Sequence, residues 1–493
     1  MDILVATGKL AEGTVRKAVG SKAHIIVLDM DIAAFITPRR LIDALKKERA
    51  QKHYDMIFVP GLVSGDFSRV AQELESKVYL GPKHAYDLEY VLDFVGKIEF
   101  SATVPACELL ADVRKRIALE KVQQIETASE PLMCIKDLKL GGGSRMKILA
   151  EIVDATGIET TALEKKILAF VDHGADMIDL GASLNATPDD VERTIRVARK
   201  VTTLPISIDT LEPALLARAI GTGVDLVLSL NDSNLDEIGP LAASEKVAVV
   251  IIPDSCEGLE SLIKNIEKAK ELGIRKIIAD PVLDPIGHGI ASSIVRYYGF
   301  NRSFPEIPVF FGAGNVTELL DVDSHGVNAT LCGIAADLGA SILFTPEYSN
   351  KTQGSIRELK VASQMMILAM ERQSSPKDLG IDLIVLKEKR RREDADIPSE
   401  FTTAKEHRMW KIDPAGSVKI GIIPYDERTN KGLIIAEHEN AKIVGSNAKT
   451  VLDTLIDMQL VSTLEHAGYL GQELKKAEIA LKFNRSYAQD DEF

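Results

Sequence analysis

The sequence has few aromatic residues and no excess of basic charge. Aromatic residues make up 5% of the 493 residues, with a single tryptophan, so the chain lacks the rings on which single-stranded nucleic acid stacks. The 59 Lys and Arg are outnumbered by 73 Asp and Glu, which gives a net charge of −14. An acidic chain does not favour a polyanion as its main partner. We therefore predict that nucleic acid is not a partner.

Cysteine is scarce and long apolar runs are missing. The four cysteines lie far apart in sequence, at Cys107, Cys134, Cys256 and Cys332, which is typical of reduced thiols in a cytoplasmic protein and gives no local metal-binding spacing. No apolar stretch approaches the length of a membrane span. The opening segment MDILVATGKL lacks the basic flank and the long apolar region of a signal peptide. These features predict a cytoplasmic protein without a membrane anchor.

The length of the chain and its pattern of apolar segments predict three domains. Residues 1–130 alternate short apolar runs with helical patterns, which is typical of an α/β, Rossmann-like domain followed by a connecting helix. LMCIKDLKLGGGSRMKIL reads as a β-hairpin that leads into the next domain. Residues 371–493 contain two strand patterns, SVKIGIIPY and GLIIAEHE, and two helical patterns, and so predict a small α+β domain.

The central part, residues 131–370, repeats a strand-then-helix pattern eight times. Eight such units match a (β/α)₈ TIM barrel, which typically has about 250 residues. The alternative is an open, doubly wound sheet, but no reversal of order is evident. The expected strands are KILAEIV, DMIDLG, LPISID, VDLVLSL, VAVVIIPD, KIIADP, IPVFFG and ASILFTP.

Polar side chains follow most of these strands at the point where each strand ends. Because active sites of TIM barrels lie at the carboxyl ends of the strands, we expect these side chains to meet at one mouth. Capping of a loop or helix is the alternative role at each position, foremost at Asp254 and also at Asp179. The strand-end residues are Glu151, Asp154, Asp179, Asp209, Ser229, Asn231, Asp254, Asp280 and Asn315.

The predicted mouth is acidic and carries amide and hydroxyl groups. A flat heterocycle rich in N–H donors suits it, because a carboxylate can accept two parallel hydrogen bonds from such a ring. A polyphosphate suits it poorly, since Lys351 and Arg357 are the nearest cations in sequence. A metal site built from Asp209, Asp280, Glu151 and His288 is the competing hypothesis. The spacing of these residues does not favour it, and we predict no metal.

Four segments in order resemble the pterin-binding family, which comprises dihydropteroate synthases and methyltransferases that use methyl-tetrahydropterins. The segments are HGADMIDLGAS, PISIDT, IIADPVLDPIG and FFGAGNVTE, and the resemblance covers about residues 146–370. The whole chain resembles an archaeal group of dihydropteroate synthase-related proteins, with TGKLAE, VPGLVSGD and HAGYLGQELKKAE as further familiar segments. The resemblance implies that Asp209 and Asp280 bind a pterin ring.

Departures from the family patterns favour the methyltransferase branch. The loops that handle the diphosphate and the arylamine in the synthases are replaced here by VDATGIET, SLNATP and TPEYSNKT. Glu151 and Asp154 match the first-strand element of the methyltransferases, and Asn315 matches their seventh-strand asparagine. The asparagine expected at the end of the fourth strand falls on Leu228, and Asn231 is the nearest substitute.

The resemblance thus implies an enzyme that binds tetrahydromethanopterin or tetrahydrofolate and moves a methyl group between the pterin N5 and a corrinoid. Asn315 is the expected catalytic residue. Asp209, Asp280, Asn231, Glu151, Asp154, Asp179 and Ser229 are the expected pterin-binding residues. Cobalamin would arrive on a separate corrinoid protein, and a homodimer is the expected assembly. The alternatives are a synthase-type condensation of a pterin with an arylamine and a non-catalytic pterin-binding or assembly protein.

Overall fold

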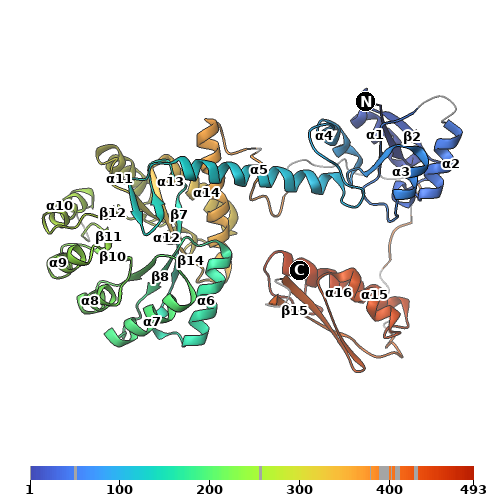
Figure 1. The fold of residues 1–493 in the computed structure, drawn as a ribbon. Helices are drawn as coiled ribbons and strands as arrows, with labels where there is room; N and C mark the ends of the chain where they lie inside the picture. Colours follow the sequence, from blue (N-terminus) through green and yellow to red (C-terminus); the bar gives the residue numbers. More distant parts are fainter. Residues whose placement is uncertain are drawn as a thin grey trace. The chain divides into compact units, whose positions relative to one another are not determined.

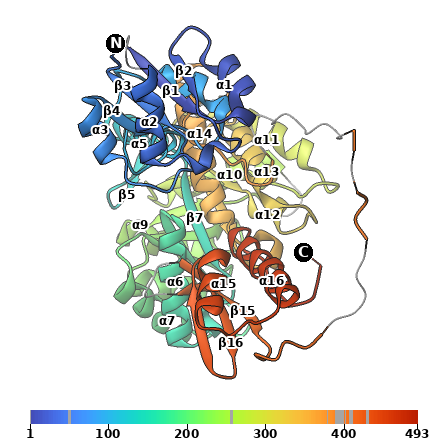
Figure 2. The ribbon, with the colours of Figure 1, turned by 90° about the vertical axis from the view of Figure 1, so that its right-hand side faces the viewer.

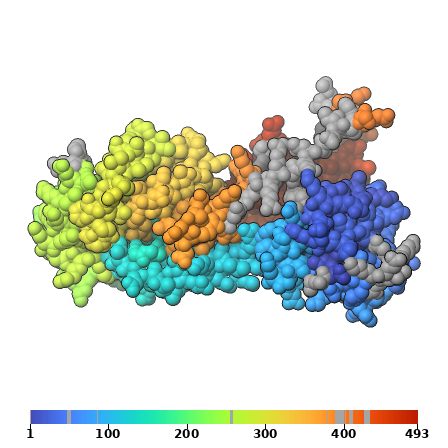
Figure 3. Space-filling model, turned by 90° about the horizontal axis from the view of Figure 1, so that it is seen from above, coloured from blue at the N-terminus to red at the C-terminus, as the bar shows by residue number. Residues whose placement is uncertain are grey.

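The computed structural model describes residues 2–48, 53–254, 258–377, 379–387, 399–400, 402–405, 411–426 and 431–492, and Figure 3 shows the other residues in grey. Cys256 lies outside the described residues. The chain forms two compact units, Met1–Lys389 and Arg390–Phe493. Within the first unit, the domain borders near residues 130 and 370 stay predictions. No helix among the described residues is long and apolar enough to cross a membrane.

The N-terminal part is a parallel sheet with helices on both faces (Figure 1). Its strands are β1 (Ile3–Thr7), β2 (His24–Val27), β3 (Met56–Val59) and β4 (Lys77–Leu80), in the order β2-β1-β3-β4. Side chains of β1 alternate between two apolar clusters. One cluster includes α2 (Pro38–Glu48) and α3 (Ser68–Leu74), and the other includes α1 (Glu12–Val19) and α4 (Leu88–Leu92). The predicted α/β domain is therefore confirmed.

A long helix and a hairpin lead into the barrel, as predicted. Helix α5 (Ala106–Ala128) buries Leu110 in the N-terminal core and Val122 in a cluster with Ile367 of α14 (Ser355–Arg372). The hairpin pairs β5 (Met133–Ile135) with β6 (Leu138–Leu140) in antiparallel register. Its Ile135 and Leu140 belong to the apolar cluster that fills the inside of the barrel. The hairpin therefore closes one end of the barrel, a role that the sequence pattern did not indicate.

Eight parallel strands close the barrel, and all eight predicted strands are confirmed. Leu149, Met177, Ile278 and Phe310 fill the inside, while a larger cluster packs the strands against the surrounding helices. The strands are β7 (Lys147–Ile152), β8 (Met177–Gly181), β9 (Ile206–Asp209), β10 (Leu226–Leu230), β11 (Ala248–Ile251), β12 (Ile277–Ala279), β13 (Val309–Gly312) and β14 (Ala340–Pro346). The helices between them are α6 (Thr160–His173), α7 (Pro188–Val201), α8 (Pro213–Thr222), α9 (Leu235–Glu245), α10 (Gly258–Glu271), α11 (Ile290–Ser303), α12 (Gly314–Thr317) and α13 (Ser324–Asp337).

A buried charge network lies at the amino ends of the barrel strands. Asp176 accepts hydrogen bonds from Arg145 and Lys360 at 2.7 Å each and from the Ile148 backbone N at 2.9 Å. Lys147, 1% exposed, pairs with Glu126 of α5 at 2.8 Å. These buried polar groups provide hydrogen-bond and ion-pair partners for one another. The network therefore connects α5, β7 and α14 at the end of the barrel opposite to the predicted site.

The C-terminal unit is a three-stranded antiparallel sheet with two helices against it (Figure 2). Strands β15 (Lys419–Asp426) and β16 (Lys431–His438) and helices α15 (Ala448–Asp457) and α16 (Leu464–Lys482) confirm the predicted α+β character. The third strand, β17 (Ala441–Gly445), was missing from the prediction. Asp413 caps α16 through hydrogen bonds from the Thr463 backbone N at 3.1 Å and His466 Nδ1 at 3.0 Å.

Candidate functional site

The carboxyl ends of the barrel strands bring Glu151, Asp179 and Asp209 together. Glu151 of β7 is level with Asp179 of β8, which is level with Ser207 of β9. Since parallel neighbours in register present their side chains on the same face, these groups point into one space. One carboxylate oxygen from each of the three acids lies within 4.8 Å of the others. The predicted acidic mouth therefore exists.

Asp179 forms the floor of this cluster and is fully buried. Its Oδ1 accepts a hydrogen bond from Ser207 Oγ at 2.5 Å, while its Oδ2 is buried without a partner among the described residues. Burial, together with the nearby Asp209 and Glu151, raises the pKa of Asp179 well above its usual value. An unsatisfied buried oxygen is costly, and a ligand N–H or a cation would satisfy it.

Asp209 and Glu151 lie beside Asp179, and burial raises the pKa of each of them as well. Ser229 Oγ donates to Asp209 Oδ1 at 2.8 Å, yet burial still raises the pKa of Asp209. Burial, followed by the charges of Asp209, Glu318 and Asp154, raises the pKa of Glu151 to about 7. Crowded carboxylates of this kind retain protons near neutral pH unless a positive or N–H-rich group neutralises them.

Ser229 reaches Asp209 because strand β10 is irregular at this point. The register of β10 against β11 shifts between Val227 and Leu230, and Ser229 has a φ of 68°. A bulge of this kind re-aims side chains and is common beside active sites. Leu228 instead points into the apolar cluster inside the barrel, 3% exposed. Leu228, the position at which the family resemblance leads us to expect an asparagine, is therefore part of the apolar interior of the barrel.

Asp280 lies at the tip of β12 in a rigid loop and is 9% exposed. Its Oδ1 accepts hydrogen bonds from Tyr297 Oη and the Val282 backbone N, both at 2.8 Å. Burial raises the pKa of Asp280 to about 6, although these two hydrogen bonds oppose the shift. In the described part of the chain, no protein group hydrogen-bonds Oδ2, so this oxygen remains available to a ligand.

The loop after Asp280 stores backbone strain. Val282 has a φ of 65°, which is a rare conformation for a β-branched residue and costs on the order of 1–3 kcal/mol. Arg296 of α11 holds the loop through the carbonyl oxygens of Pro281 at 3.2 Å and Val282 at 2.8 Å, and through Asp284 at 2.8 Å. The surrounding structure thus fixes the position of the Asp280 carboxylate, as expected for a side chain that binds a ligand in one orientation.

Asn315 lies in the short helix α12 directly after β13. Its Nδ2 donates to the Leu283 carbonyl oxygen at 3.0 Å, so α12 is tied to the Asp280 loop. The second amide proton and Oδ1 have no hydrogen-bond partner among the described residues. The predicted catalytic asparagine therefore lies next to the predicted pterin-binding carboxylate.

Other predicted residues take part in loop structure. Asn231 Oδ1 accepts from the Ser233 backbone N at 3.0 Å, which closes the turn before α9. Asp254 Oδ1 accepts from Asn265 Nδ2 and from the Asp232 backbone N, both at 3.2 Å, in the capping role expected of it. Asp154 is exposed, has a φ of 53° and begins a 3₁₀ turn after β7.

Several residues that shape the site were missed in the sequence. Tyr297 and Arg296 come from α11, and their helical pattern gives no sign of a contact with Asp280. Glu318 accepts hydrogen bonds from the Tyr348 and Ser349 backbone N atoms at 3.0 and 3.1 Å and so fixes the loop after β14. Only Ser207, level with Asp179 in the barrel register, could have been found, because it precedes Asp209 by two residues on the same strand face.

The four residues of the competing metal hypothesis do not gather. Glu151 and Asp209 meet, but His288 is exposed on the loop, and the third member of the cluster is Asp179. The cations nearest in sequence are also engaged, because Lys351 pairs with Asp321 at 2.6 Å and Arg357 with Asp172 at 3.9 Å. The mouth thus offers carboxylates and hydroxyls, and the charge of Lys166 reaches Glu151.

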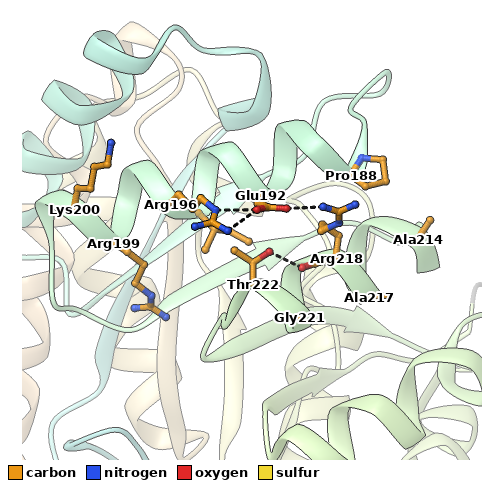
Figure 4. Close-up of a pocket in the computed structure, with 11 residues that line it drawn as sticks. Pro188, Glu192, Arg196, Arg199, Lys200, Ala214, Ala217, Arg218, Gly221 and Thr222 are labelled. Carbon is orange, nitrogen blue, oxygen red and sulfur yellow. Dashed lines mark hydrogen bonds and ion pairs between the residues drawn. The ribbon is translucent and has the colours of Figure 1, made fainter.

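A hollow of about 920 Å³ lies elsewhere on the barrel, between the outer helices α7 and α8. Figure 4 shows Glu192 there between Arg196 and Arg218, with hydrogen bonds of 2.6 and 2.5 Å. The hollow opens on the outside of the helical ring, where Glu192 pairs with both Arg196 and Arg218. It carries none of the strand-end residues and does not compete with the mouth as a catalytic site.

From the raised pKa of Glu151 we predict how the free energy of unfolding depends on pH. Because the folded pKa of about 7 exceeds the usual value of 4.5, folding favours the protonated acid, and stability falls as the pH rises from 4.5 to about 7. Glu151→Gln should therefore raise the free energy of unfolding by about 1–3 kcal/mol at pH 8 and change it little at pH 4. Urea unfolding at both pH values checks this, and an equal effect at pH 4 and pH 8 would contradict it.

Comparisons with known proteins identify the family of the chain. The family model described as "Pterin binding enzyme" matches residues 156–343, and the model "PterinBD-DUF4346" matches residues 412–490. An uncharacterised protein of the archaeon Methanocaldococcus jannaschii is 38% identical over 522 aligned positions, covering 99% of this chain and 98% of the relative.

Among solved structures, dihydropteroate synthases are similar to the barrel. The Yersinia pestis enzyme with a pterine-sulfa conjugate has a TM-score of 0.39 and 18% identity, covering 49% of this chain and 99% of the other. The Clostridium difficile enzyme in the presence of pteroic acid has a TM-score of 0.37 and 19% identity, covering 45% and 96%. With the matching family model over its barrel and a relative along its whole length, the chain belongs to the pterin-binding enzyme family.

Proposed function

We propose that the mouth of the barrel binds a reduced pterin between Asp209 and Asp280. The free Oδ2 of Asp280 carries this proposal, because a fixed carboxylate with one open oxygen is suited to the N–H edge of a pterin ring. Glu151, Asp154, Asp179, Ser229 and Asn231 complete the proposed binding residues. The unpartnered Oδ2 of Asp179 supports it, since a ring with several N–H groups would neutralise this crowded site.

The proposed reaction is methyl transfer between N5 of a methyl-tetrahydropterin and a corrinoid. Condensation from a pterin diphosphate would place several negative charges beside Glu151, Asp209 and Asp280, while Lys351 and Arg357 are paired elsewhere. A methyl-tetrahydropterin brings no diphosphate and avoids this repulsion. The pterin would be tetrahydromethanopterin or tetrahydrofolate, and cobalamin would come on a separate corrinoid protein.

Methyl departure leaves an electron pair on N5, and the mouth contains groups that can stabilise it. The C–N5 bond breaks, the methyl group moves to the reduced cobalt, and N5 gains a proton. Asn315 would hydrogen-bond N5 through its unused amide atoms, while Glu151, with a pKa of about 7, would supply the proton through water. Positioned proton transfer contributes about 10²–10⁴-fold to a rate.

Replacement of Asn315 tests its assigned role. Asn315→Ala should lower the rate of methyl transfer about 10–100-fold, because a hydrogen bond that strengthens in the transition state is lost. Pterin affinity should change much less, so kcat and KM should separate. Asp254→Asn is the matched control, because Asp254 caps the loop after β11 at the same end of the barrel. Equal losses in the two variants would contradict a catalytic role of Asn315.

The overall reaction is tested with methyl-tetrahydrofolate or methyl-tetrahydromethanopterin and chemically reduced cobalamin. The absorption spectrum should change to that of methylcobalamin in the presence of the wild-type protein. An unchanged spectrum with both pterins, under conditions where binding is measured, would remove methyl transfer. Product formation from a pterin diphosphate and an arylamine would instead establish the synthase-type reaction.

A further inference from the structure

We infer that the N-terminal domain holds a second ligand site, for a small aromatic molecule of one or two fused rings with a polar edge. The site lies at the carboxyl ends of β1 and β3. The chain passes from β1 to β2 on one side and then crosses to β3 on the other, as the order β2-β1-β3-β4 shows. At such a reversal the loops that follow the two central strands separate, and open α/β sheets bind ligands in the crevice between them.

One wall of the crevice is formed by the loops after β1 and β2, which are fastened together. The Lys9 and Leu10 backbone N atoms donate to the carbonyl oxygens of Met30 at 2.8 Å and Asp31 at 3.2 Å. A Cβ atom on Gly8 would lie 2.8 Å from the Asp31 carbonyl oxygen, so only glycine permits this approach. The wall is therefore held by the backbone and does not depend on a ligand.

The loops after β3 and β4 form the opposite wall in the same way. The Gly61 backbone N donates to the Pro82 carbonyl oxygen at 3.0 Å, and the Gly81 backbone N donates to the Val59 carbonyl oxygen at 2.6 Å. A Cβ atom on Gly61 would lie 2.5 Å from the Gly81 carbonyl oxygen. These two pairs of loops are held by backbone contacts and leave a crevice between them. A ligand could therefore enter the crevice without rearrangement of the loops.

The crevice encloses a cavity of about 390 Å³, within the range of small-molecule sites. Val5, Ala6, Phe58 and Val59 form an apolar floor. Leu10, Ile32 and Leu62 stand at the rim with 76%, 49% and 53% of their surface exposed. Large apolar side chains that gather around one cavity mark a surface that a ligand covers.

The polar groups in the lining define the ligand further. Thr7, Thr14, Asp31 and Lys83 are the lining residues with polar side chains. The one cationic side chain, Lys83, pairs with Glu108 outside the cavity, so the lining has no spare positive charge for a nucleotide or polyphosphate. A flat ring would fill the space between the two walls and direct its polar edge to the hydroxyl groups. The site is independent of the pterin proposed for the barrel.

A fluorescence titration of the full chain with 2-naphthol tests the site, because this probe is a fused aromatic ring with an uncharged polar edge. Saturable binding at one site per chain is expected. Ala34→Trp places a ring in the cavity wall and should weaken binding about tenfold or more. Asp43→Trp adds the same ring to the exposed face of α2 and is the matched control.

Hydrogen exchange on the wild-type protein locates the probe without any substitution. The probe should slow exchange in residues 5–15, 31–34 and 58–62, and leave the strand ends of the barrel unchanged. Protection outside the N-terminal domain, or equal affinity in Ala34→Trp and Asp43→Trp, would overturn the inference, as would a lack of saturable binding. Asp280→Asn should leave probe binding unchanged, so the result does not depend on the proposed function.

Discussion

Asp280→Asn is expected to weaken the binding of a reduced pterin about 100-fold. The wild-type carboxylate offers its free Oδ2 to the ring, while Tyr297 and the Val282 backbone N hold Oδ1 at 2.8 Å. An amide in the same place presents one oxygen and two N–H donors, so it cannot accept from Tyr297, Val282 and the ring together. Hydrogen bonds to a charged group contribute about 1.5–3 kcal/mol each, and 2.7 kcal/mol is about 100-fold in affinity.

Isothermal titration calorimetry with tetrahydrofolate or tetrahydromethanopterin measures this effect. Asp254→Asn is again the control, because in the described part of the chain that carboxylate accepts hydrogen bonds from the Asp232 backbone N and from Asn265 of α10. Its affinity should stay within a few-fold of wild type. Wild-type affinity in Asp280→Asn, with the fold intact by circular dichroism, would show that the ring is held elsewhere.

Asp176→Ala is expected to cause the largest loss of stability in the barrel, about 3–5 kcal/mol. The substitution leaves the buried Arg145 and the partly buried Lys360 without their counter-ion, and the Ile148 backbone N loses its acceptor. Such a loss is a large part of the 5–15 kcal/mol that typically separates folded from unfolded protein. Asp189→Ala is the matched control, because the Asp189 side chain is 90% exposed and its pair with Arg218 should contribute little.

The same substitution has a defined pH dependence. Burial alone would raise the pKa of Asp176, but Arg145 and Lys360 outweigh it and lower the pKa to about 2. The carboxylate therefore stabilises the fold above its unfolded pKa of 3.8, and this contribution is lost as the pH falls through about 2. The difference in urea midpoint between wild type and Asp176→Ala should be constant above pH 5 and shrink below pH 4. A difference independent of pH would contradict the ion-pair explanation.

The barrel was predictable because its strands are apolar on both faces and its helices follow at regular intervals. The same alternation identified the N-terminal sheet and the strand-end carboxylates. Strand β17 was missed because AKIVG is short and follows β16 after only two residues. Its apolar pattern is too brief to be distinguished from a loop.

The geometry of the site was less predictable, since it depends on contacts between distant parts of the chain. Tyr297 reaches Asp280 from a helix face that reads as ordinary core. Ser229 turns toward Asp209 through a positive φ that no local residue preference indicates. Leu228 was interpreted as a vacant ligand position, but the bulge of β10 directs it into the apolar interior.

The most direct test of the central proposal is a crystal structure of the protein soaked with a reduced pterin. We expect one ring at the barrel mouth, with its N–H edge within hydrogen-bond distance of Asp209 and of the free oxygen of Asp280, and with N5 near Asn315. A ring bound outside the mouth, or a mouth without a ring at pterin concentrations that saturate binding in solution, would contradict it.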